Sequence, residues 1–289
     1  MKKFIAFLLS IFILAGMCSA MALNEGDARA VIGANLTEEQ IRQVYETFNI
    51  ERDSVKELRV TNDEERQYLD GLVDSSLIGT RAISCVYIEI LAEGEGLNVS
   101  TSNISWCTKE MYVNALVTAG IDDARVIVTA PFAVSGTAAL TGIYKAYEDI
   151  TGETLDELAK IVGTQELVIT AELADEIGSY DAVTIVNELK LILDETKNMT
   201  DDELRDTIRE LADEYNVSIT DGQVDQLIKL CRSLEKLSTD ELKSKVESVQ
   251  EAIKKMAGAK ETVNKFVDSA KKIIKAIGNF FNKLLSKLR

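Results

Sequence analysis

The stretch that decides the fold runs from Ala124 to Glu148 and reads ARVIVTAPFAVSGTAALTGIYKAYE. It contains the only proline of the chain, Pro131. β-Branched residues predict a strand over Ala124–Thr129, and the small residues that follow predict a turn and then a helix over about Thr137–Ile150. Strand and helix signals alternate before this stretch, whereas every periodic segment after it is helical. We therefore expect it to close a sheet domain and to begin a helical domain.

Upstream of this stretch the sequence predicts two groups of strands and helices. The first is a strand over Arg29–Ala34 followed by a helix that starts with a capping box at Thr37 and Gln40. The second has the order β-α-β-β-α-β and consists of strand Glu57–Thr61, a helix capped by Asn62, strands Arg81–Leu91 and Leu97–Trp106 joined by a glycine-containing turn, helix Thr108–Ala119 and strand Ala124–Thr129. This order is typical of a mixed sheet with helices on one face.

Beyond Gly152 the apolar residues recur at the helical period. Capping-box spacing marks four helix starts, at Thr154/Glu157, Thr200/Glu203, Thr220/Gln223 and Ser238/Glu241. The fold class predicted is α+β, with a mixed sheet built on the β-α-β-β-α-β core plus flanking helices, followed by an all-helical C-terminal region. The predicted divisions are a signal peptide (1–22), a sheet domain (23–150), a helical domain (151–258) and a cationic amphipathic helix (259–289).

The first 22 residues have the layout of a secretory signal. Lys2 and Lys3 precede an apolar run from Phe4 to Met17, and small residues stand at Ala20 and Ala22. A lipoprotein signal would use the cysteine that follows Met17, but a small residue is expected where this methionine stands. We expect an exported, secreted or extracellular protein whose mature chain begins after residue 22.

The charge of the chain is strongly acidic and unevenly distributed. Removing Lys2 and Lys3 changes the formal charge from −16 to −18, and the segment Lys254–Arg289 carries ten basic and two acidic residues, a net +8. The remainder of the mature chain therefore carries −26. This balance speaks against nucleic-acid binding, which needs a basic surface to neutralise phosphates.

Histidine is absent from the chain. This excludes nucleophiles activated by an imidazole and histidine-ligated metal sites. Cys85 and Cys107 lie in the two strand-like runs on either side of the turn 93–96, so a disulfide between them and two unpaired core thiols are both open. Cys231 falls on the apolar face of a helix, which favours a buried thiol.

The C-terminal segment has an apolar stripe opposite a lysine-rich face. The candidate contact face consists of Phe266, Ile273, Ile274, Ile277, Phe280, Phe281 and Leu284. This pattern fits a helix lying on an anionic membrane surface, and it equally fits a helix docked on an acidic protein body. The sequence favours protein docking, because most amphipathic helices pack within their own protein.

Sites with a chemical function are weakly indicated. Ser135-Gly136-Thr137 follows a strand, but no nucleotide-binding motif is completed, so packing and capping explain these residues better than a phosphate site. The acid pairs Glu172/Glu176 and Glu210/Glu214 have the spacing of solvated helix faces. We identify no catalytic, cofactor-binding or metal-binding residue. Five asparagines match the glycosylation acceptor pattern: Asn35, Asn98, Asn103, Asn198 and Asn216.

Several blocks of the sequence resemble the YpuA-like family of exported proteins, which is a domain of unknown function. The blocks begin at Gly79 (GTRAIS), Gly96 (GLNV) and Met111 (MYVNALVTAG), and the most specific one begins at Val128 (VTAPFAVSGTAALTGI). The resemblance covers most of residues 33–177. It implies an exported protein and supplies no catalytic or binding residue.

These observations predict a secreted, noncatalytic protein of the cell envelope or surface, with an unknown protein or envelope component as partner and contact with an anionic membrane as an additional possibility for its C-terminal helix. A carboxylate-dependent hydrolase of wall or extracellular polymer is the alternative. It requires a cleft with two facing acids about 5 to 9.5 Å apart.

Overall fold

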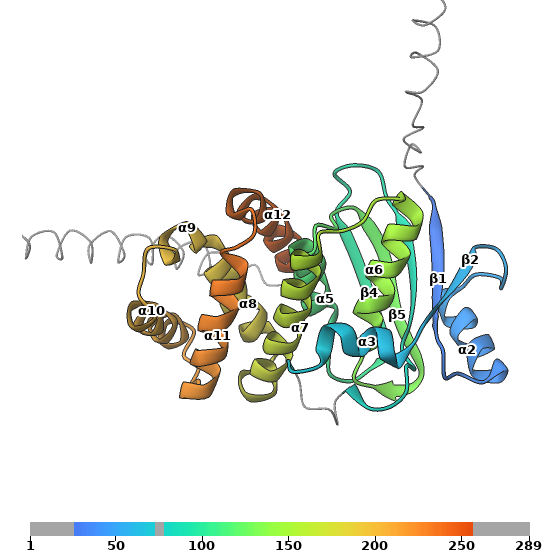
Figure 1. Ribbon diagram of the computed structural model, residues 1–289, viewed down its shortest axis with the longest axis horizontal. Coiled ribbons are helices and arrows are strands. Elements are labelled where there is room, and N and C mark those ends of the chain that lie inside the picture. Colours follow the sequence, from blue (N-terminus) through green and yellow to red (C-terminus); the bar gives the residue numbers. More distant parts are fainter. Residues whose placement is uncertain (1–25, 73–77, 257–289) are drawn as a thin grey trace, which may run out of the picture.

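The computed structural model describes residues 26–72 and 78–256, and its sheet has five strands (Figure 1). The strands are β1 (Ala28–Gly33), β2 (Lys56–Val60), β3 (Cys85–Ile90), β4 (Leu97–Ile104) and β5 (Ala124–Val134), in the spatial order β2-β1-β3-β5-β4. β3 runs antiparallel to both of its neighbours, whereas β1 pairs with β2 and β4 pairs with β5 in parallel. The predicted mixed sheet is confirmed.

Helices cover both faces of this sheet, not one. On one face α2 (Glu38–Phe48) packs Ile41, Val44 and Phe48 on the side chains of β1 and β3. On the other face lie α5 (Lys109–Thr118) and α6 (Thr137–Thr151), and α3 (Asn62–Leu69) packs beside α6 (Figure 1). The strands reflect this arrangement, because successive residues such as Val86 and Tyr87 both point into apolar clusters on opposite faces.

The predicted element order is confirmed along the chain, but the expected pairing of the two middle strands is not. The sequence suggested that the turn 93–96 joins β3 and β4 as a hairpin. β5 instead lies between them and pairs Val128 with Val86 on one side and with Thr101 on the other. Short chain separation favours a hairpin, but here the position between β3 and β4 is occupied by β5, in which Ala124, Val126 and Val128 are fully buried.

β5 is longer than the sequence indicated, because the strand continues through Pro131. Pairing with β3 ends at Thr129, and pairing with β4 shifts register between Ser102 and Ile104. Proline has no N–H to donate to a ladder, so it is tolerated where a strand bulges. Gly136 then caps α6 at φ +102, and a Cβ there would stand 2.5 Å from Tyr112 Oη. Only glycine fits this turn.

The region after α6 is helical, as predicted. It contains α7 (Glu157–Ile177), α8 (Ser179–Leu191), α9 (Leu193–Thr196), α10 (Asp201–Glu214), α11 (Asp221–Leu234) and α12 (Thr239–Met256). Capping boxes form at Thr200 and Thr220 as expected. α7 instead begins after Asp156, whose side chain accepts from Ala159 N at 2.8 Å, so the cap proposed at Thr154 is wrong.

One hydrophobic cluster runs from the sheet into the helical region. It extends from Val31 in β1 through α5 and α6 to Val249 in α12. α7 is the link, because it packs against α5 on one side and α8 on the other. The boundary between a sheet domain and a helical domain at residue 150 stays a prediction. The predicted signal peptide (1–22) and the predicted C-terminal helix (259–289) lie outside the described residues, which end with α12 at Met256.

Candidate functional site

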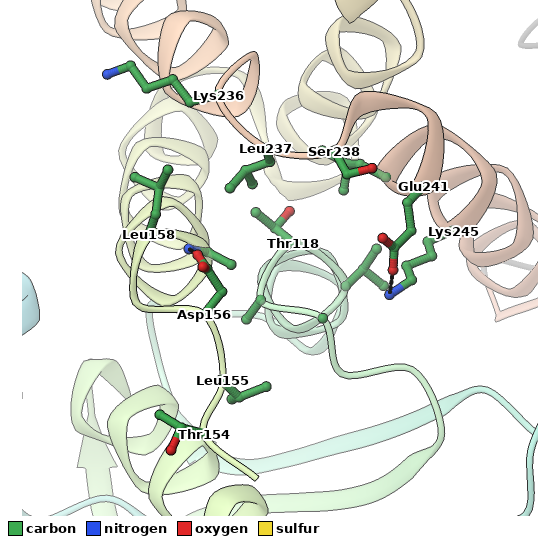
Figure 2. Close-up of a pocket in the computed structure, with 15 residues that line it drawn as sticks. Thr118, Thr154, Leu155, Asp156, Leu158, Lys236, Leu237, Ser238, Glu241 and Lys245 are labelled. Atoms are coloured by element: carbon green, nitrogen blue, oxygen red, sulfur yellow. Dashed lines mark hydrogen bonds and ion pairs between the residues drawn. The ribbon is translucent and has the colours of Figure 1, made fainter.

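A cleft of about 450 Å³ opens where α5, α7 and α12 meet (Figure 2). Its floor is the end of α5 with the following turn, one wall is the start of α7, and the other is the link between α11 and α12 with the first turns of α12. The labelled side chains around it are Thr118, Thr154, Leu155, Asp156, Leu158, Lys236, Leu237, Ser238, Glu241 and Lys245. Clefts of this size hold small molecules or short peptide segments.

Charged groups fix both walls of the cleft. Asp156 caps α7, while Glu148 at the end of α6 accepts from Leu155 N at 3.0 Å and from Lys160 Nζ at 2.9 Å. Across the cleft, Lys245 Nζ lies 2.9 Å from both Glu241 Oε1 and Asp122 Oδ2. Burial disfavours the charge of Lys245, but its two acidic partners outweigh burial and raise its pKa.

The α7 side of the cleft exposes apolar surface. Leu158 is 39% exposed and lines the cleft, and Ile161, one turn further along α7, is 41% exposed. Within the part of the chain that the structure describes, the remaining large hydrophobic side chain with comparable exposure is Phe132 in β5, at 45%. Leu158 and Ile161 lie one helical turn apart, so together they form a small apolar surface beside the cleft.

Two further clefts adjoin the first and extend it toward the end of the sheet. One of about 410 Å³ shares Val117 and Lys245 with it, and one of about 440 Å³ shares Asp122 and Asp123 with the second. We call these three clefts the acidic groove. Its acidic residues are Glu93, Glu95, Asp122, Asp123, Asp156 and Glu241, against two basic residues, Lys236 and Lys245.

A buried ion pair lies behind the floor of the first cleft. Thr118 Oγ1 donates to Glu166 Oε2 at 2.5 Å, and Glu166 Oε1 lies 2.5 Å from Lys190 Nζ. Both charged side chains are 0% exposed, and Lys190 also donates to Asn114 O at 3.2 Å. Burial raises the pKa of Glu166 and lowers that of Lys190, since each loses hydration of its charged form.

The sequence reading missed this pair, although each member carries a signal. Glu166 interrupts the otherwise apolar and small-residue run of α7, and Lys190 stands between two leucines. A charged residue in such a run is either exposed or paired. Whether Glu166 and Lys190 are exposed or paired depends on how α7 packs against α8, and the sequence of either helix alone does not determine this packing.

The turn Ser135-Gly136-Thr137 does not form a phosphate site. Thr137 Oγ1 donates to Glu65 Oε1 at 2.6 Å, which places a buried carboxylate where a phosphate would bind. The structure therefore agrees with the expectation that these residues serve packing and capping rather than phosphate binding. The acid pairs Glu172/Glu176 and Glu210/Glu214 line none of the clefts described above.

The proposed disulfide is absent from the structure, because Cys85 and Cys107 are free, buried thiols. Cys85 packs in the cluster under α2, whereas Cys107 belongs to the cluster on the other face of the sheet. The pairing rested on a β3–β4 hairpin, and β5 separates those strands. Cys231 is fully buried in α11, as its position on the apolar face suggested.

The five asparagines that match the glycosylation pattern are all exposed, so each is accessible to modification. Their glycosylation stays a prediction. At Asn103 and Asn198 the side-chain nitrogen already donates, to Ala130 O and to Asp194 O. Within residues 26–72 and 78–256, no group of three or more cysteine and acidic side chains is placed to hold a metal ion, and no helix is long and apolar enough to cross a membrane. The predicted contact face of the C-terminal segment lies outside these ranges.

Comparison with known proteins places the chain in a family. Residues 32–256 match the family described as "Protein of unknown function (DUF1002)". The chain is 39% identical to the "Uncharacterized protein YpuA" of Bacillus subtilis (strain 168), in an alignment that covers 97% of this chain and 96% of that protein. No solved structure shows a significant match. The resemblance noted in the sequence is thus confirmed, and the chain belongs to the DUF1002 family of proteins of unknown function.

Proposed function

We propose that the protein is an exported, noncatalytic interaction protein of the cell envelope, and that its acidic groove binds a basic, amphipathic segment of a protein partner. The observation that carries this proposal is the combination of the acid-rich lining of the groove with the exposed Leu158 in its first cleft and the exposed Ile161 one helical turn away on α7. A basic amphipathic segment satisfies both features, because its apolar face covers the leucine and isoleucine while its lysines face the acids.

The acids of the first cleft already have structural roles, which favours binding over catalysis. Asp156 caps α7, and Glu241 pairs with Lys245. A general acid or base needs a carboxyl group that is available to exchange a proton with substrate. Release of reducing ends or peptides from purified wall polymer, lost in Asp156→Asn and Glu241→Gln, would instead support the hydrolase alternative.

Site-specific photocrosslinking in living cells tests the partner. A photoreactive amino acid replaces Leu158 in the full chain, and the matched control replaces Phe132, which is equally exposed but lies on β5 outside the groove. We expect a crosslinked protein at position 158 and not at 132, with the crosslinked peptide basic and amphipathic. The same products at both positions, or lipid alone, would contradict the proposal.

The chain's own C-terminal segment has the same chemistry and is a distinct outcome of this experiment. A crosslink from position 158 to residues 257–289 would mean that the groove holds this segment. Charge provides a second test, since Glu93 and Glu95 are exposed at the groove. Replacing both by glutamine is expected to weaken partner crosslinking, and more strongly at low salt than at high salt.

Export is tested separately by cell fractionation and N-terminal sequencing. The expected mature chain begins at Leu23 and is recovered outside the cytoplasm. Recovery of an uncleaved chain in the cytoplasm would contradict the envelope assignment.

A further inference from the structure

Glu65 is a buried carboxylate at the opposite end of the sheet from the acidic groove. α3 turns two residues toward the protein, Leu69 and Glu65, and Glu65 is 1% exposed. Acidic residues are almost never buried to this extent unless they are paired. Its neighbour Glu64 shows the usual alternative, because it lies nearer the surface and pairs with Lys145 at 2.5 Å.

The bonds made by Glu65 leave part of its acceptor capacity unused. Thr137 Oγ1 donates to Oε1 at 2.6 Å, and Asn62 Nδ2 donates to Oε2 at 3.2 Å. A carboxylate has about four lone-pair positions. Among the described residues no lysine or arginine forms an ion pair with Glu65, and the neighbouring Arg66 pairs with Asp70 instead. The buried carboxyl group is therefore left without a cationic partner.

A cavity of about 150 Å³ adjoins this carboxylate, and we call it the Glu65 cavity. Besides Glu65 it is lined by Ile78, Arg81, Ile83, Ser84, Val134, Ser135, Gly136, Thr137 and Ala138. It lies at the carboxyl ends of the parallel strands β1, β2 and β5, which is where open sheets with helical connections bind ligands. More polar than apolar surface faces this cavity: the polar groups are the Glu65 carboxylate, hydroxyl groups and the Arg81 side chain, and the apolar part comes from two isoleucines, Val134 and Ala138.

We propose that the Glu65 cavity binds a primary alkylammonium group, with the Glu65 carboxylate accepting hydrogen bonds from the ammonium and the isoleucines and Val134 contacting the alkyl chain. The volume suits a ligand part of roughly five non-hydrogen atoms, since a water molecule takes about 30 Å³. A lysine side chain or a small aliphatic amine has this shape. This proposal is independent of the acidic groove, which lies at the other end of β5.

The charge of the cavity decides between a cation and an anion. Glu65 repels an anion at close range, and the guanidinium of Arg81 is exposed and donates to Asn35 O at 3.1 Å. Burial raises the pKa of Glu65, which means that the empty cavity disfavours its charged form. A bound ammonium group reverses this effect, so the amine is expected to bind more tightly as the pH rises through the pKa of Glu65.

The test uses the full chain and three four-carbon probes of similar size but different charge: n-butylammonium, n-butyrate and n-butanol. Two-dimensional NMR of the backbone amides follows their titration. We expect n-butylammonium to cause saturable shifts at Ser84, Thr137 and Ala138, and the anionic and neutral probes to cause none. Equal shifts with butanol would mean nonspecific apolar contact, and shifts with butyrate would mean an anion site at Arg81. Either result would overturn the proposal.

Three variants locate the effect. Glu65→Gln keeps the shape of the side chain and is expected to lower the affinity for n-butylammonium by at least about tenfold, because charge-assisted hydrogen bonds are lost. Glu64→Gln is the matched control, since it removes the same charge one residue away and preserves the capping box. Ala138→Leu fills the cavity without touching the carboxylate and is expected to abolish binding. Unchanged affinity in both Glu65→Gln and Ala138→Leu would refute the site.

Discussion

Replacing Lys190 by methionine is the most informative single change, because it leaves the carboxyl group of Glu166 buried without its cation. Both side chains are 0% exposed, so neither solvent nor a counter-ion reaches the site without a structural opening. The least costly response is for Glu166 to take up a proton and keep its hydrogen bond from Thr118. The loss of stability is then the free energy needed to protonate Glu166 at the pH of the experiment.

This cost follows from the ordinary pKa of glutamate, 4.5. At pH 7 the difference is 2.5 pH units, and at about 1.4 kcal/mol per unit Lys190→Met is expected to destabilise the protein by roughly 3 to 4 kcal/mol. A buried ion pair is close to neutral compared with an uncharged replacement, so little else is added. Glu166→Gln leaves Lys190, whose ordinary pKa is 10.5, and the 3.5 pH units that separate this value from pH 7 correspond to roughly 5 kcal/mol.

The signs of the two pH dependences are opposite. In Lys190→Met the folded state holds a proton that the unfolded state has lost above pH 4.5, so its stability relative to the original protein falls as the pH rises from 4.5 to 8. In Glu166→Gln the unfolded state holds the extra proton, so the relative stability rises over the same range. The double variant is expected to lie within about 1 kcal/mol of the original protein at every pH.

Urea unfolding followed by circular dichroism between pH 5 and pH 8 measures these differences. Other titrating groups are shared by all variants and cancel when the free energies of unfolding are subtracted. The reasoning is refuted if Lys190→Met costs less than about 1 kcal/mol at pH 7, or if both single variants show the same slope with pH, because either result would mean that water solvates the pair.

Three other predictions concern single positions. Gly136→Ala is expected to destabilise the protein by more than Gly152→Ala, which should cost ~1–2 kcal/mol, as measured by thermal unfolding. Both glycines have a positive φ, but only at Gly136 would the new Cβ approach a neighbour, Tyr112 Oη, at 2.5 Å. The three buried cysteines are expected to be unreactive toward a thiol reagent until the protein unfolds, since burial raises the pKa of each to about 12, and labelling with and without urea checks this. Burial raises the folded-state pKa of Glu65, so the free energy of unfolding of Glu65→Gln, relative to that of the original protein, is expected to increase as the pH rises from 4.5 to 7. The same difference between the two proteins at pH 5 and at pH 7 would contradict this.

Most helices were predictable because their start signals are local. Thr37, Thr108, Thr200 and Thr220 each accept a hydrogen bond from the backbone three residues later, as their spacing indicated. The failures involve competing caps one or two residues away. Thr61 caps α3 in place of Asn62, and Asp156 caps α7 in place of Thr154.

Strand pairing was not predictable from the same local signals. A short glycine-containing turn between β3 and β4 favours a hairpin, and the disulfide hypothesis for Cys85 and Cys107 depended on it. The sheet places β5 between them, and there Ala124, Val126 and Val128 are fully buried between the two neighbouring strands. β5 also contacts α2, which is distant in sequence and whose position no local signal in β5 indicates.

The candidate sites were less accessible still, because each is assembled from separated segments. The first cleft of the acidic groove combines residues from 117–120, 154–159 and 236–245. In the sequence Glu65 is one acid among several at the start of a helix, and only its burial beside Thr137 distinguishes it from Glu64, which pairs with Lys145 nearer the surface. Composition did indicate an acidic body, which agrees with the acid-rich rim of the groove.

The strand and helix of residues 124–148 connect both sites and explain why they occur in one molecule. β5 begins next to Asp122 and Asp123 in the acidic groove, and its 11 residues span roughly 35 Å to Thr137 at the Glu65 cavity. α6 then returns along the sheet to Glu148, whose carboxylate holds Leu155 and thereby positions the start of α7 as a groove wall. The same unit therefore sets one wall of each site, and the fixed turn at Gly136 determines where the returning helix begins. A displacement of α6 along its axis would therefore alter the geometry of both the groove and the cavity, and the tight packing at Gly136 opposes such a displacement.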